Sequence, residues 1–283
     1  MWNEIIVMLA FYNDYLQQKV LQFTPWGDTM DTDARKQFDR TAASYAVSRA
    51  HSNSRSLELL KEFAGDRRYR IAIDIATGPG FAAFALADQC DEMIATDISK
   101  GMLRQVQKLA FERRIENVER SFADAHALPF RDASLDLIAC RTAPHHFASI
   151  PTFLSEVRRV LVRSGVFLMV DTTTSEFELP RIWHQNMEWR RDRSHVAAPP
   201  PSVWRREFGK AGFRVVAERL TTVDMEFNDW VLRSNTPEEE IEAMRIEWKN
   251  VDEKISAAYS VKDYGNGDYS FSWPVIVLKG VIS

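Results

Sequence analysis

From residue 70 onward the sequence alternates between short apolar runs and longer amphipathic stretches, and this alternation limits the fold more than any other feature. Buried strands are predicted by the apolar runs at 69–76, 92–98, 118–125, 135–141 and 166–172. Helical spacing fills the intervals at 80–90, 99–114 and 150–165. Strands that alternate with helices in this way predict an α/β fold with a doubly wound, parallel sheet.

Beyond Asp171 the alternation loosens, although further elements are still predicted. These are a helix at 201–213, a strand at 214–222, a helix at 235–255 and a strand at 271–282. Helix ends are marked by Ser99 as an N-cap, Gly165 as a C-cap and Thr236 at the start of a capping box. Pro274 indicates that the last strand starts late or lies near an edge of the sheet.

Length and composition fit one large domain, with or without an embellishment, because the chain has 283 residues and 45% of them are hydrophobic. A net charge of −4 argues against a dedicated nucleic-acid binder. Cys90 and Cys140 lie in apolar segments, which favours a reducing compartment, and the cytoplasm is the expected location. The apolar run at 5–11 is too short to span a bilayer. Residues 1–29 are expected to form an appendage that docks on the domain or on a partner, or an extension upstream of an internal start at Met30.

The segment Ile73–Gly80, IDIATGPG, places two glycines and a proline between a predicted strand and a predicted helix. Gly78 and Gly80 permit backbone angles closed to other residues and keep side chains away from the corner. Their spacing after Ala76 differs from the G-x-G-x-x-G of dinucleotide enzymes. Because helix amides point across such a corner, we expect a nucleotide-like ligand with an anionic end.

Acidic residues follow the next two predicted strands. Asp97 can accept hydrogen bonds from a ribose diol, or it can serve only as an acid at the start of the next helix. Asp124, with Ala125, can hold the edge of an adenine, or it can be an ordinary turn residue. Each signal is weak alone, and the three signals together predict a nucleoside pocket.

The segments IDIATGPG, ATDISKGML, ADAHALPFRDASLDLI and FLSEVRRVLVRSGVFLMVD together resemble the successive motifs of class I S-adenosylmethionine-dependent methyltransferases. Within that class they resemble the type 11 group, which includes the ubiquinone/menaquinone-biosynthesis-like enzymes. The resemblance covers residues 70–172 and implies a Rossmann-like, seven-stranded sheet whose last strand is antiparallel. It also implies a helical lid at 30–69 and a methyltransferase domain at 70–283 with cap insertions at 173–200 and 225–260.

S-adenosylmethionine is the cofactor that this resemblance implies. The implied cofactor-binding residues are Asp74, Ala76, Thr77, Gly78, Gly80, Asp97, Ile98, Met102, Asp124, Ala125 and Arg141. In that scheme Asp74 and the 76–80 backbone hold the methionine end, while Asp97 holds the ribose. Ile98 and Met102 pack on the adenine, and Asp124 with Ala125 reads its edge.

The roles of Ala76 and Arg141 in this scheme depend on their local structure. Ala76 stands where many relatives have glycine, and alanine fits there if its φ is negative. Arg141 can contact the carboxylate of the cofactor, or it can be a surface charge near a helix.

His145 and His146 follow the fourth predicted strand, where this fold opens toward cofactor and acceptor. One of them can be a general base or orient the acceptor, or both can simply line the pocket and cap the next helix. Adjacent side chains diverge, so at most one should face the acceptor, and Pro144 fixes the turn that aims them. None of the six histidines shows the spacing of a metal ligand, and no metal is expected.

The acceptor pocket is expected to involve the later aromatic residues. Trp183 and Trp230 can form an aromatic lid, or they can build the core of the cap. Tyr45 can close over the cofactor or pack on the sheet. The arginines at 190–193 can attract an acidic acceptor, or they can form a solvated face.

The sequence therefore predicts a methyltransferase that transfers the methyl group of S-adenosylmethionine to a small organic acceptor, aromatic or hydrophobic, at O, C or N. The alternative is a non-catalytic module that binds the cofactor or its demethylated product and uses the cap for a protein partner. A nicotinamide dehydrogenase is disfavoured by the spacing of the glycines. We expect a monomer or homodimer with no nucleic-acid partner and no transmembrane segment.

Overall fold

The computed structural model describes Arg35, Phe38, Asp39 and residues 55–283. The predicted appendage at 1–29 lies outside the described residues, as does most of the predicted lid at 30–69. What the structure describes of that lid ends in helix α4, Arg55–Ala64, which leads directly into the sheet.

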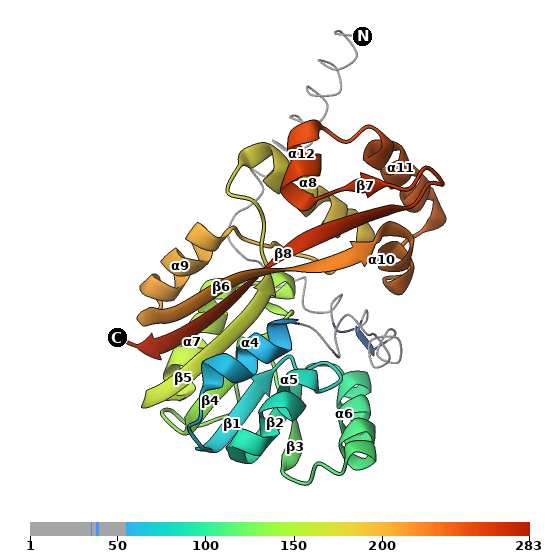
Figure 1. Ribbon diagram of the computed structural model, residues 1–283. Coiled ribbons are helices and arrows are strands. Elements are labelled where there is room, and N and C mark those ends of the chain that lie inside the picture. Colours follow the sequence, from blue (N-terminus) through green and yellow to red (C-terminus); the bar gives the residue numbers. More distant parts are fainter. Residues whose placement is uncertain (1–34, 36–37, 40–54) are drawn as a thin grey trace.

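A mixed sheet forms the centre of the molecule, with seven strands in the order β3-β2-β1-β4-β5-β8-β6 (Figure 1). Their bounds are β1 Tyr69–Ile75, β2 Cys90–Asp97, β3 Val118–Phe122, β4 Leu135–Arg141, β5 Leu161–Thr172, β6 Phe213–Glu226 and β8 Tyr269–Ile282. The first five strands are parallel neighbours, while β8 runs antiparallel to both β5 and β6. This confirms the predicted seven-stranded, Rossmann-like sheet, to which the two-residue strand β7, Lys262–Asp263, adds a short pairing with β8.

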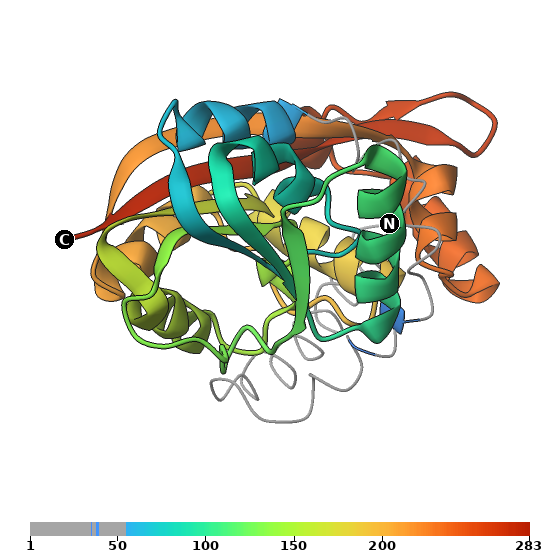
Figure 2. The same ribbon diagram turned by 90° about the horizontal axis from the view of Figure 1, so that it is seen from below.

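Helices cover both faces of the sheet, as Figure 2 shows from below. One face packs against α4, α5 and α6, with α5 at Phe81–Leu86 and α6 at Lys100–Arg113. The other face packs against α7, Ile150–Val160, and α9, Pro201–Lys210. Because successive side chains of a strand point to opposite faces, neighbouring residues such as Ala72 and Ile73 enter different cores. Single 3₁₀ turns at Ala87–Gln89 and Pro144–His146 complete the connections after α5 and β4.

A helical cap stands on one end of the sheet. It contains α8 Glu178–Arg191, α10 Phe227–Arg233, α11 Glu238–Lys249 and α12 Glu253–Tyr259. These helices surround the first half of β8 and share an aromatic core made of Trp183, Phe227, Trp230, Trp248, Tyr259, Tyr269, Phe271 and Trp273. Strands β6 and β8 run without interruption from the sheet into this cap (Figure 1). The cap is therefore joined to the sheet by continuous backbone pairing.

The structure confirms one of two predicted helix ends and contradicts the other. Ser99 caps α6, since its Oγ accepts a hydrogen bond from the Met102 amide at 3.0 Å, which confirms that prediction. The prediction for Gly165 is wrong, because α7 ends at Val160 and the chain enters β5 at once. The absence of a side chain at Gly165 serves packing instead, since a Cβ there would lie 2.6 Å from a methyl group of Leu161.

Three predictions in the later half are also corrected. Thr236 does not cap α11, because its hydroxyl donates to the carbonyl oxygens of Arg191 and Val231. The single helix predicted at 235–255 is two helices, with Asp252 capping the second. Pro274 does not delay β8, which begins at Tyr269, although β8 does lie beside the edge strand β6. Pro274 lies inside the strand, next to Val275 of the last pair with β5, and Thr173 donates to its carbonyl oxygen.

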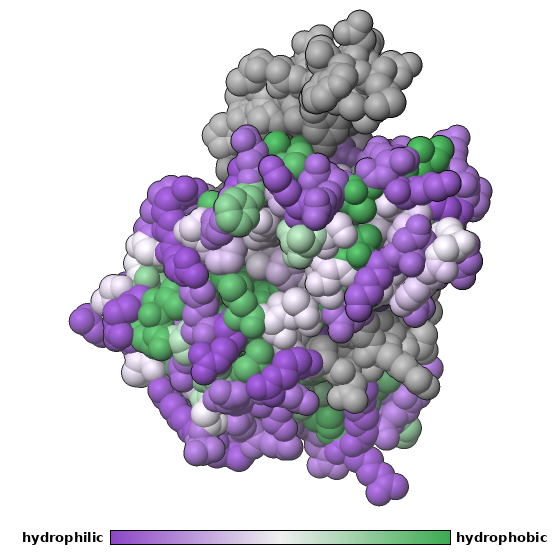
Figure 3. All heavy atoms as spheres, turned by 45° about the horizontal axis from the view of Figure 1, so that its top comes forward, coloured by the Kyte–Doolittle hydropathy of each residue, from purple (hydrophilic) through white to green (hydrophobic). Residues whose placement is uncertain are grey.

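One face of the molecule is mainly polar. Figure 3 shows one face of the molecule largely in hydrophilic colours, with hydrophobic residues in separate groups. Among the described residues, no helix is both long and apolar enough to cross a bilayer. Cys90 and Cys140 are buried and unlinked.

Candidate active site

A pocket opens where the carboxyl ends of the parallel strands meet the cap. Asp74 of β1, Asp97 of β2, Arg141 of β4 and Thr172 of β5 line its sheet side. The cap side is lined by Glu188, Arg191, Val223, Met225, Trp230, Arg233, Trp273 and Val275. Parallel strands place their carboxyl ends at one edge of the sheet, which is why residues so far apart in sequence share this pocket.

Asp74 braces the corner that follows β1. One of its carboxylate oxygens accepts hydrogen bonds from the Thr77 hydroxyl at 2.6 Å and the Ala83 amide at 3.0 Å. Its other oxygen, Oδ1, is buried without a protein partner among the described residues. Burial raises the pKa of Asp74 to about 7 despite these two donors. A buried acceptor without a partner, on a residue that lines a pocket, is suited to a cationic donor from a ligand.

The glycine corner leaves less room for a ligand than its two glycines predict. Gly78 and Gly80 both have positive φ, at 55° and 97°. A Cβ at Gly78 would meet no atom within 4 Å, so this residue leaves open space beside the pocket. Gly80 does not line the pocket, and a Cβ there would lie 2.8 Å from the ring of Phe84. Only Gly78 of the two therefore leaves room for a ligand.

Ala76 corrects an expectation, because its φ is +51° and not negative. An L-residue with a side chain in this region carries a strain of roughly 1 kcal/mol or more relative to right-handed angles. The corner also presents fewer unbonded amides than predicted. The amide of Gly78 donates to Asp97, that of Gly80 to the carbonyl oxygen of Thr77, and that of Ala83 to Asp74.

Asp97 ends β2 and holds two loops together. Its carboxylate accepts from the Gly78 amide at 2.9 Å and from the Ser99 amide at 2.8 Å. Burial raises its pKa to about 6. The side chain lines the pocket and is not solvated, unlike the helix-start acid that was the alternative. A buried carboxylate still has lone pairs for further donors, such as hydroxyl groups of a ligand.

Ile98, Met102, Asp124 and Ala125 form the next wall of the pocket. Asp124 also bonds within its own turn, because its Oδ1 contacts both the amide and the Nδ1 of His126 at 2.8 Å. It thus combines the turn role and the pocket position that the sequence left open.

Arg141 lies at the end of β4 and reaches Ser56 of α4, with 3.3 Å between Nε and Oγ. Burial lowers its pKa to about 10, while the nearby charge of Asp74 acts in the opposite direction. Arg141 lines the pocket beside Thr77 and Asp74, so it is not a surface charge.

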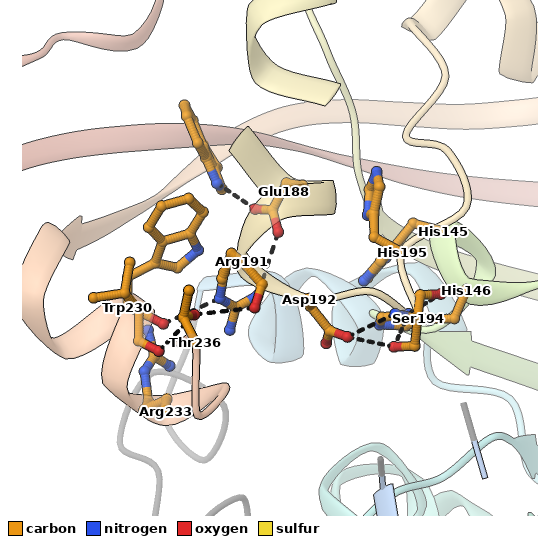
Figure 4. Close-up of polar contacts among 12 residues, drawn as sticks. His145, His146, Glu188, Arg191, Asp192, Ser194, His195, Trp230, Arg233 and Thr236 are labelled. Carbon is orange, nitrogen blue, oxygen red and sulfur yellow. Dashed lines mark hydrogen bonds and ion pairs between the residues drawn. The ribbon is translucent and has the colours of Figure 1, made fainter. Parts of the chain in front are cut away.

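His145 and His146 both line the pocket, but their surroundings differ. His145 is bound through Nδ1 to Oδ1 of Asp171 at 2.6 Å. His146 is bound through Nδ1 to the backbone carbonyl and hydroxyl of Ser194, each at 3.1 Å (Figure 4). The two histidines could not be distinguished from the sequence, since their partners lie 26 and 48 residues away.

The residues expected in the acceptor pocket do not all lie there. Trp230 lines the pocket, whereas Trp183 does not and packs in the aromatic core of the cap, with its ring 5.1 Å from that of Trp248. Tyr45 lies outside the described residues.

The arginines at 190–193 do not form a solvated face. Arg190 and Arg193 form ion pairs with Glu240, and Arg191 turns into the pocket. Arg191 contacts Glu188 and donates to the carbonyl oxygen of Trp230 (Figure 4).

Sequence reasoning missed two residues of this region. Asp171 is fully buried behind His145, and Glu188 accepts from the indole nitrogen of Trp273, which lines the pocket. Asp171 carries a signal that could have found it, because it follows an apolar strand just as Asp97 does. Glu188 carries none, since only the packing of α8 on β8 brings it to Trp273.

Known proteins share this architecture. A family model described as a methyltransferase domain matches residues 73–169. The uncharacterized methyltransferase YcgJ of Bacillus subtilis (strain 168) is 27% identical over 245 residues, covering 86% of this chain and 97% of that protein. The malonyl-(acyl-carrier protein) O-methyltransferase of Geobacter sulfurreducens is 31% identical over 192 residues, covering 64% of this chain and 70% of that enzyme. The crystal structure of YcgJ matches with a TM-score of 0.74 at 28% identity, covering 80% of this chain and 97% of that one.

The matched segment begins in β1 and ends in β5, so it contains the strands whose ends form the sheet side of the pocket. The relative from Geobacter sulfurreducens is matched over more than two thirds of its own length. These findings confirm the predicted family and its cofactor, S-adenosylmethionine. The chain belongs to the S-adenosylmethionine-dependent methyltransferases.

Proposed function

We propose that this methyltransferase acts on a small organic acceptor, aromatic or hydrophobic, which lies in the cap side of the pocket. One observation carries the proposal: a single pocket has carboxylates at strand ends on one side and the indoles of Trp230 and Trp273 on the other. The first side is suited to a polar, cationic cofactor, and the second to a flat or apolar molecule.

The residues at the sheet edge fit the cofactor. The unpartnered Oδ1 of Asp74 can accept from the ammonium of the methionine portion, and the space beside Gly78 leaves room for that portion. Arg141 lies beside Asp74 and can bind the carboxylate of the same portion. Ala76 and Thr77 complete this part of the wall.

The nucleoside end fits the adjoining wall. Asp97 can accept from the ribose hydroxyls, since its carboxylate faces the pocket while its two backbone donors hold it in place. Ile98 and Met102 provide an apolar surface for the adenine ring, and Asp124 with Ala125 lies where the edge of that ring would be read. Gly80 acts indirectly, by letting the chain turn above Phe84.

When bound, S-adenosylmethionine supplies a methyl group already activated by its sulfonium. The protein then has to align the acceptor atom with that carbon and exclude water. Alignment of this kind can supply about 7–11 kcal/mol of the barrier. The cap fits this task, because its aromatic core places buried rings directly over the pocket.

The names of the relatives indicate a range of acceptors. Relatives of this chain include methyltransferases named for malonyl-(acyl-carrier protein) and for demethylmenaquinone, which are chemically unlike one another. The buried, unlinked cysteines suit a reducing compartment, and we place the activity in the cytoplasm, in a monomer or homodimer.

Transfer of a labelled methyl group from S-adenosylmethionine to a panel of small molecules tests this function. We expect label in at least one small aromatic or hydrophobic product, and transfer only to protein or nucleic acid would contradict the proposal. In the same preparation, Asp97→Ala should weaken cofactor binding by about 1–3 kcal/mol, because buried donors of the ribose lose their partner. Calorimetry that finds unchanged affinity would remove the ribose role of Asp97.

A further inference from the structure

We propose that His145 is the general base of this methyltransferase, that Asp171 is the residue that positions it, and that the acceptor therefore carries a phenolic or enolic hydroxyl. This inference rests on the proposed function, since it names the class of acceptor for the same pocket. The observation behind it is the direct contact between the two side chains at the carboxyl ends of β4 and β5.

The contact fixes the tautomer of His145. Asp171 is completely buried, and its Oδ1 lies 2.6 Å from Nδ1 of His145. A carboxylate can only accept a hydrogen bond, so Nδ1 carries the proton and the neutral ring has its lone pair on Nε2. Within the part of the chain that the structure describes, Nε2 has no hydrogen-bond partner, and His145 lines the pocket.

The backbone of His145 is fixed as well. Its carbonyl oxygen accepts from the amides of Val196 and Ala197, at 2.8 and 3.2 Å. The segment after α8 thus pins the short turn that carries His145, while Asp171 pins its ring. A base held at both points keeps its lone pair in one direction, which is what proton transfer requires.

His146 is not suited to the same task. Its Nδ1 faces the carbonyl oxygen of Ser194, so this nitrogen donates, and its ring packs edge-on against Phe38. Burial lowers its pKa to about 3, and the neighbouring charge of His145 acts in the same direction. A group with so low a pKa is a weak base at neutral pH.

Several charged or titratable groups face His145 from the elements packed around it. They are Asp171 of β5, His184 and Glu188 of α8, Asp192 and His195 of the segment after α8, and the adjacent His146. Burial disfavours the imidazolium, but the charge and hydrogen bond of Asp171 outweigh it and hold the pKa of His145 above its ordinary value. A general base is most effective when its pKa lies near the operating pH, and the upward shift moves the pKa of His145 toward neutral pH.

The acceptor hydroxyl gives its proton to Nε2 of His145, its oxygen forms a bond to the methyl carbon, and the carbon–sulfur bond breaks with its electron pair passing to sulfur. Asp171 stabilises the imidazolium, which then releases its proton to water. The products are a methyl ether, the demethylated cofactor and one proton.

The need for a base selects the acceptor class. A phenol, with a pKa of about 10 as in tyrosine, is mostly protonated at neutral pH yet close enough to imidazole for proton transfer. Anilines are unprotonated at neutral pH and attack through a lone pair that is already present, and carboxylic acids are already ionised, so neither needs a base. The indoles of Trp230 and Trp273, on the same pocket, are suited to an aromatic or conjugated body.

Nuclear magnetic resonance of ¹⁵N-histidine in the complex with S-adenosylhomocysteine tests the dyad without an acceptor. We expect His145 to carry its proton on Nδ1 when neutral and to titrate above 6.5. Asp171→Asn should lower its pKa by at least one unit, because burial is then opposed only by the more distant charges of Glu188 and Asp192. Asp192→Asn is the matched control, a neighbouring buried carboxylate that does not touch the ring, and should shift the pKa less.

A proton on Nε2 in the neutral wild type, or an unchanged titration in Asp171→Asn, would overturn the dyad. Calorimetry on the same samples separates the two proposals: failure of the wild type to bind S-adenosylmethionine would count against the proposed function itself. Retained binding with a negative titration result would count against the dyad alone.

Turnover then tests the acceptor class, with labelled methyl donor and matched panels of phenols, anilines and benzoic acids. Phenols should be methylated fastest, and His145→Gln should reduce that rate by roughly 10²–10⁴-fold. Since the neutral base is active, the rate should rise with pH through the pKa of His145, and Asp171→Asn should move this rise to lower pH and reduce the plateau. Phenols no faster than the matched anilines and benzoic acids would overturn the assigned class.

Discussion

The sheet side and the cap side of the pocket are built in different ways. Every residue of the sheet side that we propose for the cofactor lies in the range 74–141, at the end of a strand or in the loop or first helical turn that follows it. The cap side draws on α8, α10, β6 and β8, so Arg191, Trp230 and Trp273 meet only in the folded chain.

This difference shows which kind of site a sequence can reveal. On the sheet side, a short motif and its local hydrogen bonds set the geometry, as when Asp74 binds Thr77 three residues away. On the cap side, the decisive contacts join residues far apart, as when Trp273 donates to Glu188, 85 residues away. We therefore expect the two sides to respond differently to substitution.

The largest effect is expected in the cap. Trp248 is fully buried, with its ring 4.8 Å from Phe271 and 5.1 Å from Phe227. Trp248→Ala should lower the free energy of unfolding by about 3–5 kcal/mol, through lost burial and the cavity left behind. Urea denaturation measures this loss. Affinity for S-adenosylhomocysteine should change by less than about threefold, because the proposed cofactor residues lie on the sheet side.

Trp189→Ala is the control, since Trp189 is half-buried and stacks on Arg193 with 3.7 Å between guanidinium and ring centre. It should cost about 1 kcal/mol or less. If cofactor affinity fell as steeply as stability in Trp248→Ala, the two sides would not be separate.

A smaller effect concerns pH on the sheet side. Burial raises the pKa of Asp74 to about 7, so the protein without cofactor protonates this carboxyl as pH falls from 7.5 to 5.5. The cationic cofactor favours the ionised form of Asp74. Its affinity should therefore rise about tenfold as the pH rises from 5.5 to 7.5, the effect of a change of one pKa unit, or 1.36 kcal/mol. Calorimetry at several pH values measures the slope.

The raised pKa of Asp74 also determines how the stability of the fold depends on pH. The folded pKa of Asp74 lies above that of the unfolded chain, so its contribution is present below about pH 4 and is lost as pH rises toward 7. Asp74→Asn should reduce the pH dependence of both the cofactor affinity and the stability. A wild-type affinity that is constant between pH 5.5 and 7.5 would contradict the assignment of Asp74 to the cationic end of the cofactor.

The smallest effect is expected at Ala76. Glycine would relieve the strain of a φ of +51°, but it would also increase the freedom of the unfolded chain, and the net change in stability should be within about 1 kcal/mol. Gly80→Ala is the opposite case, because its new Cβ would meet Phe84 at 2.8 Å and its φ is +97°. Thermal unfolding should rank Gly80→Ala as clearly more damaging. A tenfold change in cofactor affinity for Ala76→Gly would mean that the alanine methyl itself shapes the pocket.

Much of the fold was predictable because its signals are local. Apolar runs and helical spacing predicted β1 to β5, and the resemblance supplied the order and the antiparallel strand. The errors also have local causes. Gly165 looked like a helix end because the strand after α7 begins with Leu161, which suits either element, and only pairing with Leu135 decides.

The candidate site was predictable to the same extent. Acids after strands marked Asp74, Asp97 and Asp124, all of which line the pocket. The sequence could not choose between His145 and His146, because the choice depends on Asp171 and Ser194 from other elements. It could not separate Trp183 from Trp230 either, since both belong to one aromatic core and differ only in which reaches the pocket.

The shared ladder of β6 and β8 limits how this enzyme could be re-engineered. Thr222 pairs with Pro274 where the two strands leave the rest of the sheet, and pairing continues to Glu226 and Ser270 under the cap helices. A chimera that borrowed only the helices of another protein would leave these half-strands facing foreign side chains. Exchange of acceptor preference between relatives therefore requires transplanting both half-strands together, with their register preserved.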